Sequence, residues 1–187
     1  MNIRLGHEGI AEEDGMQHLK ILVTGPYKSG KSKMVERLST GKSINIENSG
    51  TTIGLDYGSR DYDDLKMHFF GTPGQEHLSI VSEVLADGAD GAIVVVDSSN
   101  HESIDKVKSI FSKLGCGNLP CVIAANKQDV SGALSPEQIH RIIDMPEIPV
   151  HPTSAETGEG VDGLLSKLVS RLRAKALEKR KQLQVEL

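Results

Sequence analysis

The sequence lacks most of the features that would hold a chain in a membrane or in a disulfide framework. Among its 187 residues there are only two cysteines, Cys116 and Cys121, which are too few for a disulfide scaffold or a zinc site. No stretch is long and apolar enough to cross a bilayer, and the N-terminus has no apolar signal segment. Asn2 excludes myristoylation of a second-position glycine, and residues 184–187 do not form a prenylation box. We therefore expect a cytoplasmic protein with reduced thiols and no permanent membrane anchor.

An excess of positive charge is also absent. The chain has 21 lysine and arginine residues against 26 aspartate and glutamate residues, a net charge of −5, so nucleic acid is not an expected partner. Hydrophobic residues make up 37% and charged residues 25%, which is typical of a soluble protein, and the length suits one domain with a sizeable core. Basic residues do gather at 171–181, where a solvated helix face explains them more simply than lipid contact does.

What the sequence does contain is a glycine-rich segment at residues 25–32 that reads G-x-x-x-x-G-K-S, between an apolar run and a helical pattern. The glycines allow successive N–H groups to face one anion, and the start of the helix adds its positive dipole end. Lys31 would place an ammonium on the β- and γ-phosphates, and the Ser32 hydroxyl would bind Mg²⁺. The predicted phosphate-binding residues here are Gly25, Tyr27, Lys28, Ser29, Gly30, Lys31, Ser32 and Lys33.

Strand-like and helix-like segments alternate along the chain. Residues 91–97 and 122–125 are nearly continuous aliphatic runs, as in strands buried on both faces of a parallel sheet. Apolar residues at helical spacing predict helices at 103–114 and 161–175, and Ser135 begins a helix-start pattern. Further strands are expected at 19–25, 55–58, 65–70 and 148–152, further helices at 31–38 and 80–85, and a loop at 41–51. This alternation predicts a doubly wound α/β sheet, which binds ligands at the carboxyl ends of its strands.

A second motif indicates which nucleotide is bound. Asn126-Lys127-Gln128-Asp129 follows the predicted strand that ends at Ala125. An aspartate carboxylate accepts two hydrogen bonds from the N1–H and N2 amino group of guanine, whereas adenine would leave it unpaired, a difference worth a factor of about 10⁴. Thr153-Ser154-Ala155 follows the last predicted strand, where a backbone N–H can meet guanine O6. The predicted guanine-binding residues are Asn126, Lys127, Asp129, Ser154, Ala155 and Glu156.

With these motifs in this order, the sequence resembles the small GTPases of the Ras superfamily from Leu19 to about Lys175. Thr52-Ile53-Gly54 and its separation from Gly74 resemble the Arf-like branch, and a switch II with Pro73-Gly74-Gln75 but no aspartate resembles the prokaryotic Ras-like GTPases related to the bacterial polarity GTPase. The resemblance implies a P-loop NTPase fold with six mostly parallel strands and about five helices. The G domain would span residues 18–176, between an N-terminal extension at 1–17 and a basic C-terminal helix end at 177–187.

The resemblance also implies an activity and partners. Such a protein binds GTP or GDP with Mg²⁺, hydrolyses GTP, and works with an effector, an exchange factor and an activating protein. Thr52 resembles the switch I threonine that binds Mg²⁺, with Thr51 as the alternative. Gly74 would contact the γ-phosphate through its N–H, and Gln75 would orient the attacking water, which makes Gln75 and Lys31 the expected catalytic residues.

Two further roles follow from the same resemblance. Asn126 would tie the base loop to the phosphate loop, and Lys127 would lie along the base. In Arf-like proteins the two strands between the switches slide in register when the nucleotide changes, and residues 55–70 would form that pair here. A slide by an even number of residues preserves the buried face.

The sequence departs from the family pattern at two positions. Switch II usually begins with an aspartate that holds a Mg²⁺-bound water, and Gly71 stands there instead, so the task would pass to Thr72 or to Asp56. The third residue of the phosphate loop is Tyr27 rather than glycine, and its ring would either overhang the γ-phosphate or swing outward onto switch I. We therefore expect slow, partner-dependent hydrolysis. The alternative is a module that holds GTP or GDP with little turnover.

Overall fold

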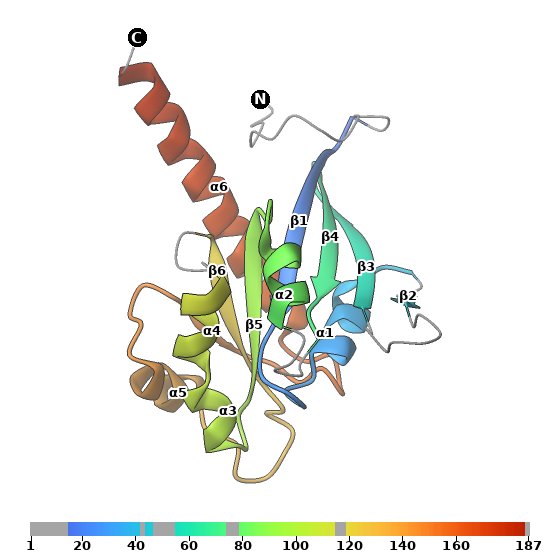
Figure 1. Ribbon diagram of the computed structural model, residues 1–187, viewed down its shortest axis with the longest axis vertical. Helices are drawn as coiled ribbons and strands as arrows, with labels where there is room; N and C mark the ends of the chain where they lie inside the picture. The colour runs from blue at the N-terminus through green and yellow to red at the C-terminus, as the bar shows by residue number, and fades with distance from the viewer. Residues whose placement is uncertain (1–14, 42–43, 47–54, 74–78, 115–118, 186–187) are drawn as a thin grey trace.

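The computed structural model describes residues 15–41, 44–46, 55–73, 79–114 and 119–185, and shows a central sheet covered by helices on both faces (Figure 1). The strands are β1 (Gln17–Thr24), β2 (Ile44–Ile46), β3 (Leu55–Tyr62), β4 (Leu65–Gly71), β5 (Gly91–Asp97), β6 (Cys121–Asn126) and β7 (Val150–Pro152). Their order is β2-β3-β4-β1-β5-β6-β7. The β2–β3 and β3–β4 pairs are antiparallel and all other pairs are parallel. The predicted mixed, mostly parallel α/β fold is confirmed.

The helices form two layers around the sheet. They are α1 (Lys31–Leu38), α2 (Ser79–Ala86), α3 (His101–Asp105), α4 (Val107–Leu114), α5 (Pro136–Ile143) and α6 (Val161–Val185). Apolar residues of α1 and α6 pack on one face of the sheet in a single cluster. Apolar residues of α3, α4 and α5 pack on the other face in a second cluster. The motif-bearing loops leave the sheet at the carboxyl ends of β1, β6 and β7, where ligands bind in such folds.

The alternation of β1 assigns its side chains to these two cores. Leu19, Ile21 and Val23 join the core under α1 and α6, and Leu22 joins the other, as the two-residue period of a strand requires. The strand next to β1 in the sheet, β5, is buried at all seven of its residues. The phosphate loop therefore starts from a strand fixed on both faces.

Several element boundaries differ from the sequence-based expectation. Strand β3 continues to Tyr62, four residues past its predicted end at 58. A three-residue strand, β2, lies in the segment predicted as a loop and makes seven strands in the described chain. The predicted helix at 103–114 is two helices separated at Lys106, and the first begins earlier because the Asn100 side chain accepts a hydrogen bond from the Glu102 amide. Helix α6 continues ten residues past the predicted end at 175.

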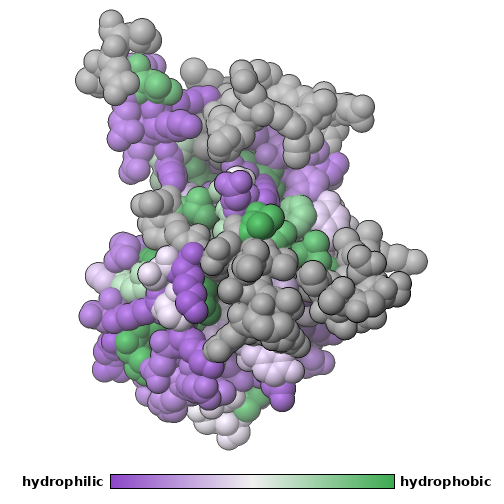
Figure 2. Space-filling view, in the orientation of Figure 1, coloured by the Kyte–Doolittle hydropathy of each residue, from purple (hydrophilic) through white to green (hydrophobic). Residues whose placement is uncertain are grey.

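The surface of the described residues is mostly hydrophilic, with apolar atoms near the centre of the face in Figure 2. Val84 of α2 and Leu177 and Leu183 of α6 are among the exposed large apolar residues. Helix α6 is long enough to span a bilayer but carries many charged residues, and no described helix combines the required length with apolar character. Cys121 is buried, whereas Cys116 is outside the described residues.

Candidate functional site

The phosphate loop connects β1 to α1, and its two motif glycines are required by close contacts. Gly25 has φ 146°, and a Cβ there would lie 2.1 Å from the Val95 carbonyl oxygen. Gly30 has φ 98°, and a Cβ there would lie 2.4 Å from the Asn126 side-chain nitrogen. Both are positive φ values that side chains rarely adopt. The loop conformation therefore depends on glycine at both ends.

The N-terminus of α1 has the properties of an anion site. Gly30 is its N-cap residue, no side chain caps it, and its first turn contains no acidic residue. The amides of the first turn are thus left for a ligand, and the helix dipole favours a negative one. The Ser29 hydroxyl is buried in the same loop and has no hydrogen-bond partner among the described residues. Ser32, in the first turn, has an exposed side chain.

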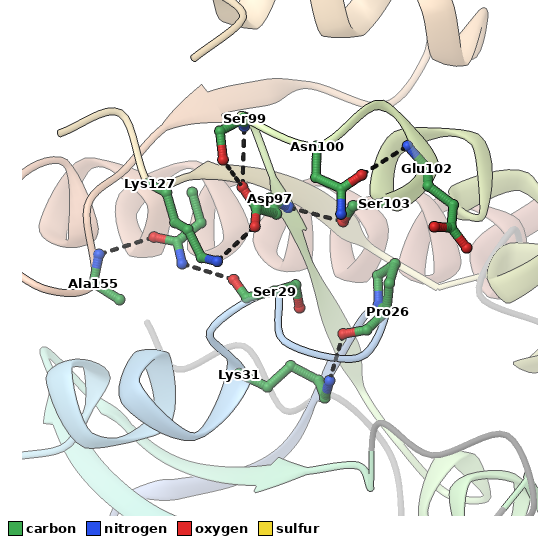
Figure 3. A network of polar contacts seen from close by, with 11 residues as sticks. Pro26, Ser29, Lys31, Asp97, Ser99, Asn100, Glu102, Ser103, Lys127 and Ala155 are labelled. Carbon is green, nitrogen blue, oxygen red and sulfur yellow. Dashed lines mark hydrogen bonds and ion pairs between the residues drawn. The ribbon is translucent and has the colours of Figure 1, made fainter. Parts of the chain in front are cut away.

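Lys31 is held inside the phosphate loop. It is 7% exposed, and its Nζ donates a 2.8 Å hydrogen bond to the Pro26 carbonyl (Figure 3). Burial lowers the pKa of Lys31 to about 8, and the negative charge of Asp56 partly opposes that effect. The side chain is therefore already positioned by the loop itself, with a carboxylate on β3 close enough to influence it.

The remaining predicted residues of the loop are more exposed. The Tyr27 side chain is 61% exposed, and Lys28 Nζ lies 5.5 Å from the centre of its ring. Lys28 itself has φ 61°. Lys33 forms an ion pair with Glu36 at 3.2 Å on the surface of α1. The structure brings Tyr27 and Lys28 together, and it directs Lys33 toward its own helix.

Asn126 links the phosphate loop to the base loops. At the end of β6, its Nδ2 donates to the Ser29 carbonyl at 2.9 Å and its Oδ1 accepts from the Ala155 amide at 2.8 Å. Asn126 is 2% exposed, so both bonds are shielded from water. Figure 3 shows Ser29 and Ala155 on opposite sides of this network. The three separate motifs of the sequence are thus joined by one side chain.

Lys127 forms an ion pair with Asp97, the last residue of β5. Its Nζ lies 2.5 Å from Asp97 Oδ2, and Asp97 Oδ1 also accepts bonds from the amide and hydroxyl of Ser99. Burial alone would raise the pKa of Asp97, but the hydrogen bonds from Lys127 and Ser99 outweigh it and hold that pKa below its usual value. Asp97 therefore caps the turn after β5, as its place at the end of a buried strand suggests, and also anchors Lys127.

The loop after β7 is fixed by a residue that sequence reasoning missed. Arg37, in the last turn of α1, donates from Nε to the Ala155 carbonyl at 2.9 Å and from a terminal nitrogen to the Glu156 carbonyl. Ser154 closes the loop on itself by accepting a bond from the Thr157 amide through its hydroxyl. No local pattern identifies Arg37, because its partners lie more than a hundred residues away.

Two groups of the base loops remain unpaired among the described residues. The Asp129 side chain is exposed and has no hydrogen-bond or ion-pair partner there. The Ala155 amide is used by Asn126 and the Ser154 amide donates to the Glu159 carbonyl, but the Glu156 amide has no acceptor in the described ranges. A carboxylate acceptor and an N–H donor are thus open at this end of the site.

Some predicted residues lie outside the described part of the chain. These are Thr51, Thr52, Gly74 and Gln75. The described residues do offer hard oxygen atoms suited to Mg²⁺ near Lys31, namely the Ser32 hydroxyl and the Asp56 carboxylate. No group of three or more His, Cys, Asp or Glu residues in the described ranges is arranged to hold a metal by itself. A metal here would therefore take some of its ligands from a bound phosphate and the others from the protein.

Comparison with known proteins agrees with this arrangement. The sequence model of the ADP-ribosylation factor family matches residues 9–172. The chain is 32% identical over 155 residues to an uncharacterized protein of Methanocaldococcus jannaschii, covering 81% of this chain and 96% of that relative. It is 30% identical over 162 residues to the Ras-related protein Rab-5B of Plasmodium falciparum, covering 82% and 77%. In fold it resembles the Arl6 BBS3 small GTPase of Trypanosoma brucei with bound GppNp, with TM-score 0.69, 24% identity and coverage of 84% and 99%.

Proposed function

Because the chain belongs to the ADP-ribosylation factor family, whose members are small GTP-binding proteins, we propose that it is a molecular switch that hydrolyses GTP slowly. The cycle is GTP binding with Mg²⁺, hydrolysis to GDP and phosphate, and exchange of GDP for GTP. Intrinsic rates of this class are on the order of 10⁻⁴ s⁻¹. The observation that supports this most directly is the Asn126 side chain, which joins the phosphate loop to the guanine motif.

The described residues divide the work of binding between two ends. At one end, Lys31 and the free amides of α1 hold the phosphates. At the other, Asp129 accepts two hydrogen bonds from the base, and the Glu156 amide donates to guanine O6. Lys127, held by Asp97, lies along the ring. Arg37 keeps the loop that carries Ala155 and Glu156 against α1.

Hydrolysis itself depends on residues outside the described ranges. We propose that Gln75 orients the attacking water, that the Gly74 amide contacts the γ-phosphate, and that Thr52 and Ser32 are Mg²⁺ ligands. Bound Mg²⁺ would supply positive charge at the phosphates. Lys31 adds an ammonium that is already desolvated and positioned, so little reorganisation is needed during reaction.

Regulation and kinship are part of the same proposal. An effector, an exchange factor and an activating protein would act on the nucleotide-dependent switches, and the G domain would occupy residues 18–176. A switch II that lacks the aspartate and continues as Pro73-Gly74-Gln75 resembles that of the prokaryotic Ras-like GTPases related to the bacterial polarity GTPase. A second candidate function is a GTP- or GDP-binding module with little turnover. It is favoured by Gly71, which replaces an acidic residue of the switch, and by the exposed Tyr27 ring in the phosphate loop.

Competition between nucleotides tests guanine recognition. A fluorescent GDP analogue is displaced from the purified protein by GDP, GTP or ATP, and the same is done with Asp129→Ala. We expect ATP to compete at least about a thousandfold less well than GTP, and the variant to lose most of this preference. Asp105→Ala, which removes an exposed carboxylate of α3, is the matched control. Equal competition by ATP, or an unchanged preference in Asp129→Ala, would contradict guanine recognition.

Single-turnover hydrolysis over a day separates the switch from the binding module. We expect slow, Mg²⁺-dependent release of phosphate that is lost in Gln75→Leu. A fast wild-type rate that is unchanged in Gln75→Leu would reject both partner dependence and the role of Gln75. Complete absence of product with tight nucleotide binding would favour the module.

A further inference from the structure

An acidic side chain from the neighbouring strand lies beside Gly71, where switch II usually begins with an aspartate. Gly71 is the last residue of β4, and it pairs with Asp56 of β3 across the antiparallel ladder. A Cβ built on Gly71 would lie 2.9 Å from Asp56 Cβ and 3.1 Å from Asp56 Oδ2. The Asp56 carboxylate therefore lies in the space that a side chain at position 71 would enter.

This shared space faces helix α1. The nearest other neighbour of a Cβ at Gly71 is Val35 of α1, at 3.4 Å, so the pair lies beneath the helix that begins at Lys31. The charge of Asp56 influences Lys31 strongly enough to oppose the effect of burial on its pKa. Asp56 thus places a negative charge, from β3, near Lys31, whose neighbour in the chain is the expected Mg²⁺ ligand Ser32.

Thr72, the other residue that the sequence offered as a replacement for the missing aspartate, already has hydrogen-bond partners. Its hydroxyl donates a 3.0 Å hydrogen bond to the Thr24 hydroxyl, its amide donates to the Val23 carbonyl, and it is 3% exposed. Successive residues of a strand also point to opposite faces, so Thr72 faces away from the side that Gly71 shares with Asp56. Of these two residues, Asp56 is the half-buried one, and its Oδ2 lies close to the Gly71 side-chain position that also borders Val35 of α1.

We propose that Asp56 supplies the carboxylate for the Mg²⁺ that binds with the nucleotide, and that Gly71 is glycine because Asp56 fills its side-chain space. The inference rests on the proposed function, since it requires that a nucleotide be bound at Lys31. The inference implies that positions 56 and 71 are coupled, because the space between them holds one acidic side chain but not two. Real Cβ atoms do not approach another carbon as closely as 2.9 Å without displacement.

The test measures how Mg²⁺ slows release of a fluorescent GDP analogue from the full-length protein. In Asp56→Asn, which keeps the shape and removes the charge, we expect the Mg²⁺ concentration for half-maximal slowing to rise about tenfold or more. With EDTA, release from the wild type and from Asp56→Asn should be equal. Asp61→Asn is the matched control, because Asp61 is an exposed carboxylate of the same strand, five residues on and therefore on the opposite face.

The reciprocal exchange keeps the inference testable if Asp56→Asn is unstable. Gly71 is not in the positive-φ region, so the obstacle to a side chain there is Asp56. Gly71→Asp alone should lower the melting temperature, and Asp56→Gly combined with Gly71→Asp should recover both folding and Mg²⁺ dependence. A Mg²⁺ requirement within twofold of wild type in Asp56→Asn would overturn the inference, as would an equal loss of nucleotide affinity in EDTA. Failure of the wild type to bind GDP at all would instead reject the proposed function.

Discussion

The two ends of the site differ in how many of their polar groups already have partners. At the base end, Asn126, Lys127 and Arg37 are engaged in hydrogen bonds or ion pairs with residues from distant parts of the chain. At the phosphate end, no described residue is a hydrogen-bond partner of the buried Ser29 hydroxyl, and none provides a side-chain cap for α1. The fold therefore builds the framework of the base end on its own and leaves Asp129 and the Glu156 amide for the base, whereas the phosphate end is completed by a ligand. Changes at the framework residues Asn126, Lys127 and Arg37 should affect folding, and changes at groups that face the ligand should affect binding.

Asn126→Ala should give the largest effect, because it removes the link between the two ends. It leaves the Ser29 carbonyl and the Ala155 amide buried without partners, which costs about 2–4 kcal/mol of the free energy of unfolding for the two groups. Urea denaturation without nucleotide measures this loss. Asn100→Ala, which removes only the cap of α3, should cost about 1 kcal/mol and leave nucleotide affinity unchanged. A stable Asn126→Ala protein would show that the base end is not built by this residue.

Lys31→Ala should separate binding from folding. Loss of a charged hydrogen bond to phosphate, worth about 1.5–3 kcal/mol, lowers affinity for GDP at least about tenfold. The free energy of unfolding should not fall, because a buried ammonium that burial disfavours is removed. Titration with a fluorescent GDP analogue and urea denaturation give the two numbers, with Lys108→Ala of α4 as the exposed control. Loss of stability with unchanged affinity would reverse the contrast between the two ends.

Asp97 provides the smallest and most specific test of the base end. Its pKa is lower in the folded protein than in the unfolded chain, so its contribution to stability is present above the unfolded pKa and disappears as the pH falls through the folded one. Below about pH 4 the wild type should lose more stability than Asp97→Asn, by at most about 1 kcal/mol for a partly exposed pair. Urea denaturation between pH 3 and 7 measures the difference. Parallel curves for the two proteins would remove Asp97 as an anchor of Lys127.

Sequence patterns were sufficient where structure is local. Helix α1 has the predicted bounds, β5 agrees residue for residue, and the capping box of Ser135 and Gln138 is present. Each depends on a period, a cap or a run that is complete within about ten residues. The prediction of an Arf-like small GTPase is confirmed, since motifs in a fixed order were enough to indicate it, whereas the kinship with the bacterial polarity GTPase stays a prediction.

The rest depends on contacts between distant segments. Strand β2 has only three residues and is defined by its pairing with β3, so no periodicity reveals it. The partners of Arg37 lie on a loop more than a hundred residues further along. The choice between Thr72 and Asp56 required knowing which strand face each residue occupies. The predicted roles of Thr52, Gly74 and Gln75 remain predictions, because these residues are outside the described ranges.

The pairing of β4 with β1 gives the position of Asp56 a further meaning. In this structure Leu65 is opposite Gln17 and Gly71 is opposite Val23. If the β3–β4 hairpin moved two residues along β1, the same faces would stay buried, but Asp56 would travel about 7 Å relative to the phosphate loop. The affinity for Mg²⁺ would then depend on the register of the hairpin relative to β1. A shift of two residues would thereby couple cation binding to the surface that β3 and β4 present to a partner protein.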